Sequence, residues 1–133
     1  PALVLAFILV TAATAQEASP FIERLGSEEV LTSSFVGQPV LLIASPLELS
    51  HTATAGIISG LNRNAASFRK TSCPTCTKLI QTDAAMHLGS SGGPLLNEDG
   101  EVIGMAALSM KENPNFNFAV SAEHIAALIA SLK

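Results

Sequence analysis

The sequence contains no tryptophan and no tyrosine, and only 14% of its 133 residues are charged. Aromatic side chains provide the stacking surfaces that bind single-stranded nucleic acid, and basic clusters neutralise its phosphates. Here seven Lys and Arg are outnumbered by eleven Asp and Glu, for a net charge of −4. We therefore expect no nucleic-acid partner. Hydrophobic residues make up 48% of the chain, so a sizeable apolar core is available and intrinsic disorder is excluded.

Long hydrophobic runs are also missing. The apolar stretch from Ala2 to Val10 is too short to cross a bilayer, which takes about 20 residues, so we expect no membrane span. Small residues follow it, and residues 1–15 therefore fit either a signal-like segment or a buried β-strand rich in Leu, Val, Ile and Phe. Because neither Met nor a basic residue precedes the stretch, we favour the strand.

Cysteine is scarce, and Cys73 and Cys76 form a single C-x-x-C. A thioredoxin-like redox site would need a βαβ setting, which the sequence does not indicate. A zinc site would need about four ligands, and no second pair of Cys or His lies nearby in the sequence. We expect two loop cysteines, bridged if the compartment is oxidising, and neither a metal nor a cofactor.

The length allows one domain, residues 1–133, at about 100 to 200 residues per domain. Short apolar segments alternate with Gly, Pro, Asn and Ser, a pattern typical of an all-β fold. The expected strands and hairpin cover residues 40–43, 52–61, 78–81, 94–104 and 116–120. Ser121 then caps a helix with apolar residues on one face, namely Ile125, Leu128, Ile129 and Leu132. The sequence predicts a small antiparallel β-barrel closed by a C-terminal helix.

Residues 89–93, which read Gly-Ser-Ser-Gly-Gly, carry the clearest chemical signal. A serine between glycines on a tight turn can expose its hydroxyl while nearby backbone N–H groups converge on an oxyanion. The segment formally matches the G-x-S-x-G elbow of α/β-hydrolases, but that motif must open a helix. Here Pro94 and a hairpin follow, so this interpretation is rejected.

The same segment, with four others, resembles the second β-barrel of chymotrypsin-fold serine proteases of the Deg/HtrA type. The similar segments occur in the family's order and cover residues 36–46, 49–59, 80–85, 89–97, and 101–104 with 117–120. The resemblance implies an antiparallel six-stranded β-barrel, the C-terminal barrel of that fold, followed by a C-terminal α-helix. It also implies that the family's N-terminal barrel is absent from this chain.

By this resemblance, Ser91 is the catalytic nucleophile, and the backbone N–H groups of Gly89 and Ser91 form the oxyanion hole. Ser90 stands where the family usually has Asn, which leaves the backbone donors in place. Asp83 matches an aspartate that is structural in the family.

The resemblance also implies a substrate-binding site. Ala85 falls at the base of the primary specificity pocket, and an apolar floor favours small or medium aliphatic side chains. A strand that pairs with the substrate backbone is formed by Leu108, Ser109 and Met110. The segment from Lys111 to Asn117 is expected to be the adjacent specificity loop.

The family's other catalytic groups have no match. The three histidines are interpreted as structural or surface residues, and none matches the family's catalytic His in the first barrel; they are His51, His87 and His124. If the first residues align with the family's strand that opens on the catalytic Asp, Val4 occupies the Asp position.

Two functions follow as expectations. The first is a serine endopeptidase that cleaves unfolded or exposed polypeptide, as in protein quality control, through an acyl-enzyme. The alternative is a catalytically inactive homologue that binds peptide as an interaction module, with a redox role for the two cysteines as a distant third. We expect the isolated chain to be inactive and to form a homo-oligomer unless the missing barrel covers it. The sequence does not fix the compartment, although secreted, periplasmic or organellar locations are favoured over the cytosol.

Overall fold

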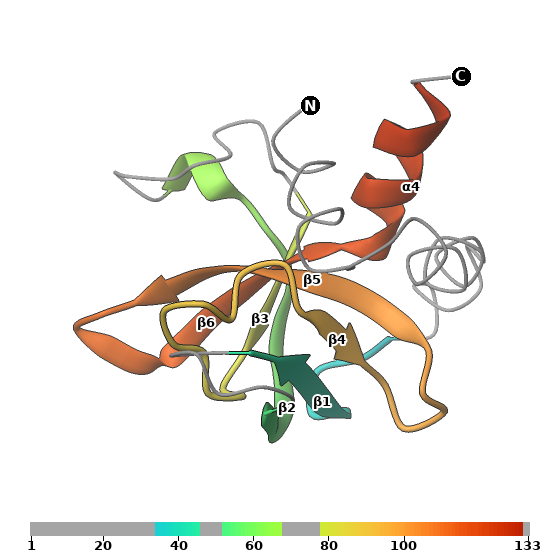
Figure 1. Cartoon of the computed structure of the whole chain (residues 1–133). Helices are drawn as coiled ribbons and strands as arrows, with labels where there is room; N and C mark the ends of the chain where they lie inside the picture. Colours follow the sequence, from blue (N-terminus) through green and yellow to red (C-terminus); the bar gives the residue numbers. More distant parts are fainter. Residues whose placement is uncertain (1–33, 46–51, 68–77, 132–133) are drawn as a thin grey trace.

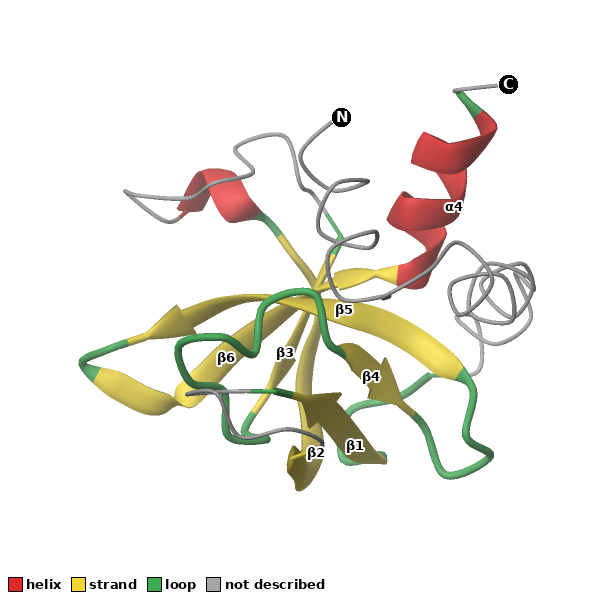
Figure 2. Ribbon diagram, viewed as in Figure 1, coloured by secondary structure: helices red, strands yellow, loops and turns green. Residues whose placement is uncertain are grey.

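The computed structural model describes residues 34–45, 52–67 and 78–131 of the chain (Figure 1). In chain order the elements are β1 (Pro39–Ala44), β2 (Thr52–Arg63), η2 (Ala65–Ser67), β3 (Leu79–Thr82), β4 (Pro94–Leu96), β5 (Val102–Met110), β6 (Asn113–Ser121) and α4 (Ala122–Ala130). Figure 2 shows that strands make up most of the described chain and that α4 comes last. Within these ranges, no helix has the length and apolar character needed to span a membrane.

The six strands close into one antiparallel barrel in the order β1-β2-β3-β6-β5-β4. Closure is made by β1 and β4, where Leu41 pairs with Leu96 and Leu42 pairs with Leu95. The last strand, β6, lies between β3 and β5 rather than at the end of the series. The predicted fold class, an all-β six-stranded barrel with a C-terminal helix, is confirmed.

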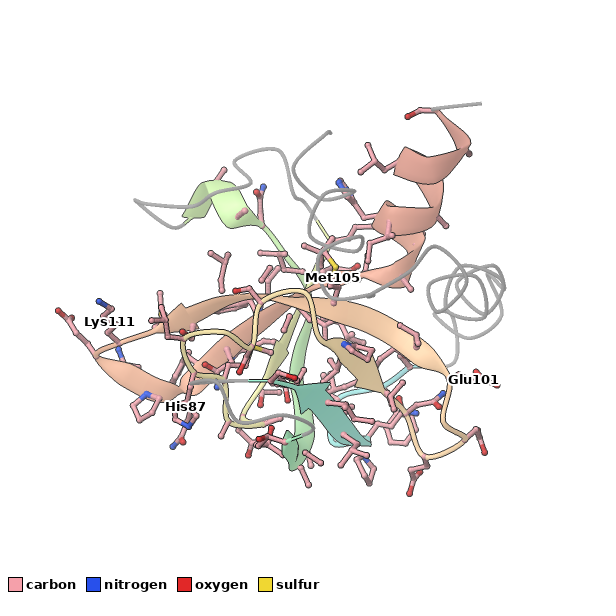
Figure 3. The ribbon with its side chains drawn as sticks, viewed as in Figure 1. His87, Glu101, Met105 and Lys111 are labelled. Atoms are coloured by element: carbon pink, nitrogen blue, oxygen red, sulfur yellow. The ribbon has the colours of Figure 1, made fainter. Side chains whose placement is uncertain are left out.

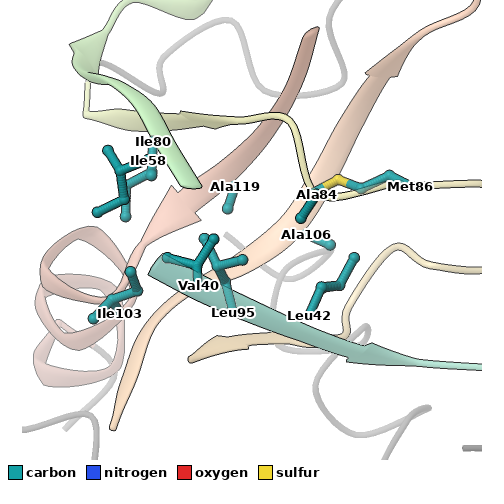
Figure 4. Packing of buried hydrophobic residues seen from close by; sticks show 10 residues of the cluster. All are labelled: Val40, Leu42, Ile58, Ile80, Ala84, Met86, Leu95, Ile103, Ala106 and Ala119. Atoms are coloured by element: carbon teal, nitrogen blue, oxygen red, sulfur yellow. The ribbon is translucent and has the colours of Figure 1, made fainter. Parts of the chain in front are cut away.

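Alternation along the strands places one set of side chains inside the barrel. In β1, Val40 and Leu42 are buried, whereas Leu41 and Ile43 are exposed. Each fully buried Leu or Ile contributes about 1.5–3 kcal/mol of transfer free energy. Figure 4 shows this core, which consists of Val40, Leu42, Ile58, Ile80, Ala84, Met86, Leu95, Ile103, Ala106 and Ala119.

A second apolar cluster joins α4 to the barrel. Ile125 of α4 is fully buried in this cluster, together with Phe118 of β6 and Met105 of β5. The helix begins where the sequence predicted, because the His124 N–H donates to Ser121 Oγ at 3.3 Å, as expected for an N-cap.

The β4–β5 turn also follows from the local sequence. Asn97 Oδ1 accepts hydrogen bonds from the N–H groups of Asp99 at 3.1 Å and Glu101 at 2.9 Å. Gly100 has a φ of 73° and its N–H donates to Asn97 O at 3.1 Å. The hairpin predicted over residues 94–104 is therefore confirmed, with its turn at the expected place.

The expected specificity loop from Lys111 to Asn117 is wrong in extent. Only Lys111 and Glu112 form a turn, and β6 already begins at Asn113. Met110 pairs with Asn113 and Ser109 pairs with Asn117, with a register shift between them that admits Pro114. The Asn and Pro content indicated a loop, but pairing with β5 extends the strand through it.

Candidate active site

The segment around Ser91 makes two consecutive tight turns. The Ser90 N–H donates to His87 O at 2.9 Å, and the Gly93 N–H donates to Ser90 O at 3.0 Å. The third residue of each turn is a glycine with positive φ, 94° at Gly89 and 90° at Gly92. This pattern is that of type II turns, in which the third position favours glycine. Ser91 is consequently the second residue of the second turn.

The two adjacent serines have opposite environments. Ser90 is only 3% exposed, and its Oγ accepts a hydrogen bond from the His87 N–H at 3.0 Å. Ser91 is exposed. The geometry therefore separates a serine that fixes the first turn from a serine whose hydroxyl is presented to solvent.

Backbone donors flank Ser90 on both sides. The Ser90 N–H is used within the first turn. Among the hydrogen bonds of the described residues, none uses the N–H of Gly89 or of Ser91. Two unpaired N–H groups next to an exposed hydroxyl are what an oxyanion hole requires.

The barrel fixes the end of the second turn. The Gly92 N–H donates to Ala106 O at 2.8 Å, and the Ala106 N–H donates to Gly93 O at 2.9 Å. Gly93 also packs against β1, because a Cβ at this position would lie 2.4 Å from Ile43 O. The turn that holds Ser91 is thus attached to β5 and lies directly against β1.

The segment that follows β3 is held by side chains from two other strands. Thr54 Oγ1 of β2 donates to Ala85 O at 2.8 Å, and Asn117 Nδ2 of β6 donates to Ala84 O at 3.0 Å. Asp83 Oδ1 accepts a hydrogen bond from the Ile57 N–H at 2.8 Å. Asp83 therefore joins this segment to β2, the structural role expected from the sequence.

One edge of β5 lacks a strand partner beyond the second turn. On that side β4 pairs with β5 only as far as Met105, and Ala106 bonds to the glycines of the turn. On the other side β6 pairs with β5 as far as Met110. In the described part of the chain, the outer edge is therefore unpaired along Leu108, Ser109 and Met110.

The histidines do not complete a catalytic pair in the described residues. His87 is exposed and lies beside the first turn, and His124 lies in α4. Figure 3 shows His87 and Lys111 on one side of the barrel in that view, away from Glu101 of the β4–β5 turn. No hydrogen bond of the described chain joins a histidine side chain to Ser91. Within the same residues, no group of three His, Cys, Asp or Glu could hold a metal ion.

Several predicted residues lie outside the described residues. They are Val4, the strand expected within residues 1–15, His51, Cys73 and Cys76.

Sequence reasoning missed one residue near the site. The expected specificity loop ends at Asn117, which the predicted strand 116–120 also includes, but neither expectation placed its side chain at the site; it is 0% exposed and bonded to the segment that precedes Ala85. Its position between Phe116 and Phe118, in the last predicted strand, is the only sequence signal that could have indicated burial.

Comparison with known proteins gives concordant matches. The sequence model of the family described as "Trypsin-like peptidase domain" matches residues 3–105. The chain is 43% identical over 79 residues to the serine protease Do-like HtrA of Bacillus subtilis (strain 168). The aligned region covers 58% of this chain and 17% of that protein. It is 42% identical over 102 residues to the mitochondrial serine protease HTRA2 of Drosophila erecta. This aligned region covers 77% of this chain and 22% of that protein. The chain thus spans about a fifth of the length of these relatives.

Solved structures show the same arrangement of strands. The HtrA-type protease AlgW with tripeptide superposes with a TM-score of 0.68 at 29% identity, covering 76% of this chain and 33% of that one. The serine endoprotease from Yersinia pestis superposes with a TM-score of 0.60 at 30% identity. The superposition covers 74% of this chain and 32% of that one.

The two serines provide a direct test of the turn geometry. We expect Ser90→Ala to lower the free energy of unfolding by about 1 kcal/mol, because the hydrogen bond that the His87 N–H donates to the buried Ser90 side chain is lost. Ser91→Ala should change it by less than about 0.5 kcal/mol, since this side chain is exposed. Urea unfolding of the two variants measures both values. A larger loss in Ser91→Ala than in Ser90→Ala would contradict the geometry described above.

Proposed function

Because this chain belongs to the trypsin-like peptidase domain family, as a barrel of the Deg/HtrA type, we propose that it carries the nucleophile of a serine endopeptidase. The observation that carries the proposal is the double turn, which presents the Ser91 hydroxyl beside two N–H groups that have no acceptor in the described chain.

In the proposed reaction, Ser91 Oγ attacks the carbonyl carbon of the scissile peptide bond and gives up its proton to a general base. The carbonyl oxygen becomes negatively charged and accepts hydrogen bonds from the N–H groups of Gly89 and Ser91. The intermediate collapses, the C–N bond breaks, and the base returns the proton to the leaving amine. Water then hydrolyses the acyl-enzyme by the same steps. Removal of one such oxyanion donor costs about 10²–10³ in kcat in known cases.

The base is the part of the machinery that the described residues do not supply. Neither His87 nor His124 is bonded to Ser91. We assign the base to a first barrel, with this chain as the C-terminal barrel of a two-barrel peptidase domain. A serine without a base is a weak nucleophile, so the 133-residue chain by itself should show no measurable hydrolysis.

The substrate is proposed to be a polypeptide. An extended peptide can add to the unpaired edge of β5 at Leu108, Ser109 and Met110, where main-chain hydrogen bonds would give affinity. Ala85 would then lie at the floor of the pocket for the residue that precedes the scissile bond (P1). The related HtrA-type protease AlgW was solved with a tripeptide, which supports a peptide as the class of ligand.

A catalytically inactive homologue that binds peptide is the second candidate. It is favoured by the lack of a histidine bonded to Ser91 in the described chain, and it would also be favoured if the first residues align so that Val4 occupies the Asp position. Peptide binding without turnover would distinguish it from the peptidase.

Active-site labelling tests the first candidate. The native protein, meaning the longer protein with the proposed first barrel, should react with a fluorophosphonate probe, and Ser91→Ala should not react. Ser90→Ala should retain labelling because the backbone hydrogen bonds that close both turns do not use the Ser90 side chain. Fluorescence on a gel after timed incubation measures the extent of reaction. Equal labelling of Ser91→Ala and the native protein would overturn the assignment of the nucleophile, and an unlabelled native protein that still binds peptide would favour the second candidate.

An apolar row on the outside of the barrel supports the expected association. Outward residues of β1 and β2 pair across the strands, as Leu41 with Ala55 and Ile43 with Ala53, and Leu41 and Ile43 are 38% and 37% exposed. We propose that the first barrel or a second copy of the chain covers this face, since large apolar patches seldom stay uncovered.

We expect the isolated chain to elute as an oligomer in size-exclusion chromatography. Leu41→Lys should shift it toward the monomer because it places a charge in the centre of the apolar row. Glu98→Lys, in the exposed β4–β5 turn, is the matched control and should leave the elution volume unchanged. A monomeric native chain would contradict this expectation.

A further inference from the structure

Strand β2 contacts the segment that leads from the end of β3 to the double turn. The Ile57 N–H donates to Asp83 Oδ1 at 2.8 Å. A Cβ at Gly56 would lie 2.4 Å from Ala84 N, so the two backbones are in direct contact at this point. Successive residues of β2 thus lie beside successive residues of a segment that belongs to no strand.

Thr54 makes the last of these contacts before the double turn. Its Oγ1 donates to Ala85 O at 2.8 Å. The backbone of Thr54 is itself held by β1, where it pairs with Leu42. Because the donor is a side-chain hydroxyl, a substitution can remove this contact and leave the pairing of the strands intact.

Ala85 is the accessible residue in this part of the segment. Figure 4 shows its two neighbours, Ala84 and Met86, in the barrel core, where they are 0% and 7% exposed. Ala85 lies between them and is partly exposed. The Thr54 hydroxyl therefore holds a residue that a bound peptide can reach.

We propose that Thr54 is a positioning residue for the selection of the P1 side chain. By holding the Ala85 carbonyl, its hydroxyl fixes the surface that a P1 side chain contacts. The inference rests on the proposed function, in which Ala85 forms the floor of the P1 site. It adds a residue of β2 that acts through Ala85 rather than on the substrate itself.

The neighbouring parts of the site have anchors of their own. Ala84 O is held by Asn117 Nδ2 at 3.0 Å, and Met86 packs in the core. The double turn is closed by its own backbone hydrogen bonds. Loss of the Thr54 hydroxyl should therefore displace mainly Ala85 and leave the nucleophile in place. The expected effect is on P1 selectivity rather than on every substrate equally.

Two peptides that differ only at P1 test the inference in the native protein, the longer protein with the proposed first barrel. A P1 Val side chain reaches the floor, whereas P1 Gly has no side chain and serves as the internal reference. Thr54→Val replaces the hydroxyl by a methyl group, and Val is well suited to a strand. We expect kcat/KM for the Val peptide to fall about tenfold, the order of one lost positioning hydrogen bond, and that for the Gly peptide to change less than about twofold. An unchanged Val/Gly ratio, or an equal fall for both peptides, would overturn the inference.

Two further variants assign the effect to the hydroxyl. Thr54→Ser keeps the donor and should retain the native Val/Gly ratio. Thr54→Ala removes it without adding a methyl group and should lower the ratio as Thr54→Val does, so the test does not depend on the folding of one variant. A purely structural role would lower the free energy of unfolding without moving the ratio. Loss of the ratio in Thr54→Ser, or its persistence in Thr54→Ala, would overturn the assignment.

Binding separates this inference from the proposed peptidase function. The same peptides are measured by calorimetry in the Ser91→Ala background, where no turnover is required. If the native protein cleaves both peptides and Thr54→Val leaves their ratio unchanged, the peptidase function stands and the inference fails. If neither peptide is cleaved but Thr54→Val removes the preference for binding the Val peptide, the inference stands and the peptidase function fails.

Discussion

The candidate site depends on the ability of the chain to reverse direction twice between His87 and Gly93. Each reversal needs a residue with positive φ, and Gly89 and Gly92 supply them. One hydrogen bond closes each turn, and both bonds use the backbone of Ser90. Because both turns use the N–H and C=O groups of Ser90, the N–H groups of Gly89 and Ser91 and the hydroxyl of Ser91 remain available for other partners. A side chain at Gly89 or Gly92 would disturb all of these groups together.

The double turn is useful only because the barrel holds it in place. Ala106 of β5 bonds to both Gly92 and Gly93, and the same strand continues to the unpaired edge at Leu108. The turn that holds the candidate nucleophile is thus bonded to β5 at Ala106, two residues before the candidate peptide-binding edge begins at Leu108. Asn117 of β6 and Thr54 of β2 hold the segment of Ala84 and Ala85 through hydrogen bonds to its carbonyl oxygens. The strands β2, β5 and β6, of which β2 is distant in sequence from the other two, therefore determine the geometry of one small region.

Local signals in the sequence predicted the parts of this structure that depend on few residues. The turn at Asn97 to Gly100, the helix cap at Ser121 and the exposure of Ser91 each follow from short-range chemistry. The extent of β6 did not follow, because its Asn and Pro residues favour a loop and only pairing with β5 makes them a strand. The burial of Asn117 has the same origin, since its strand partners Thr82 and Ser109 lie on β3 and β5. The sequence did not identify a catalytic base or the acid that orients it. In the described residues, no histidine side chain is hydrogen-bonded to Ser91.

The central claim is that Ser91 is a nucleophile whose transition state is bound by the N–H groups on either side of Ser90. The most direct test is a crystal structure of the native protein after reaction with a peptidyl phosphonate, which mimics the tetrahedral intermediate. We predict a covalent bond from phosphorus to Ser91 Oγ, with a phosphonyl oxygen about 2.7–3.1 Å from the backbone nitrogens of Gly89 and Ser91. An adduct on any other residue, or a phosphonyl oxygen directed away from both nitrogens, would contradict the account.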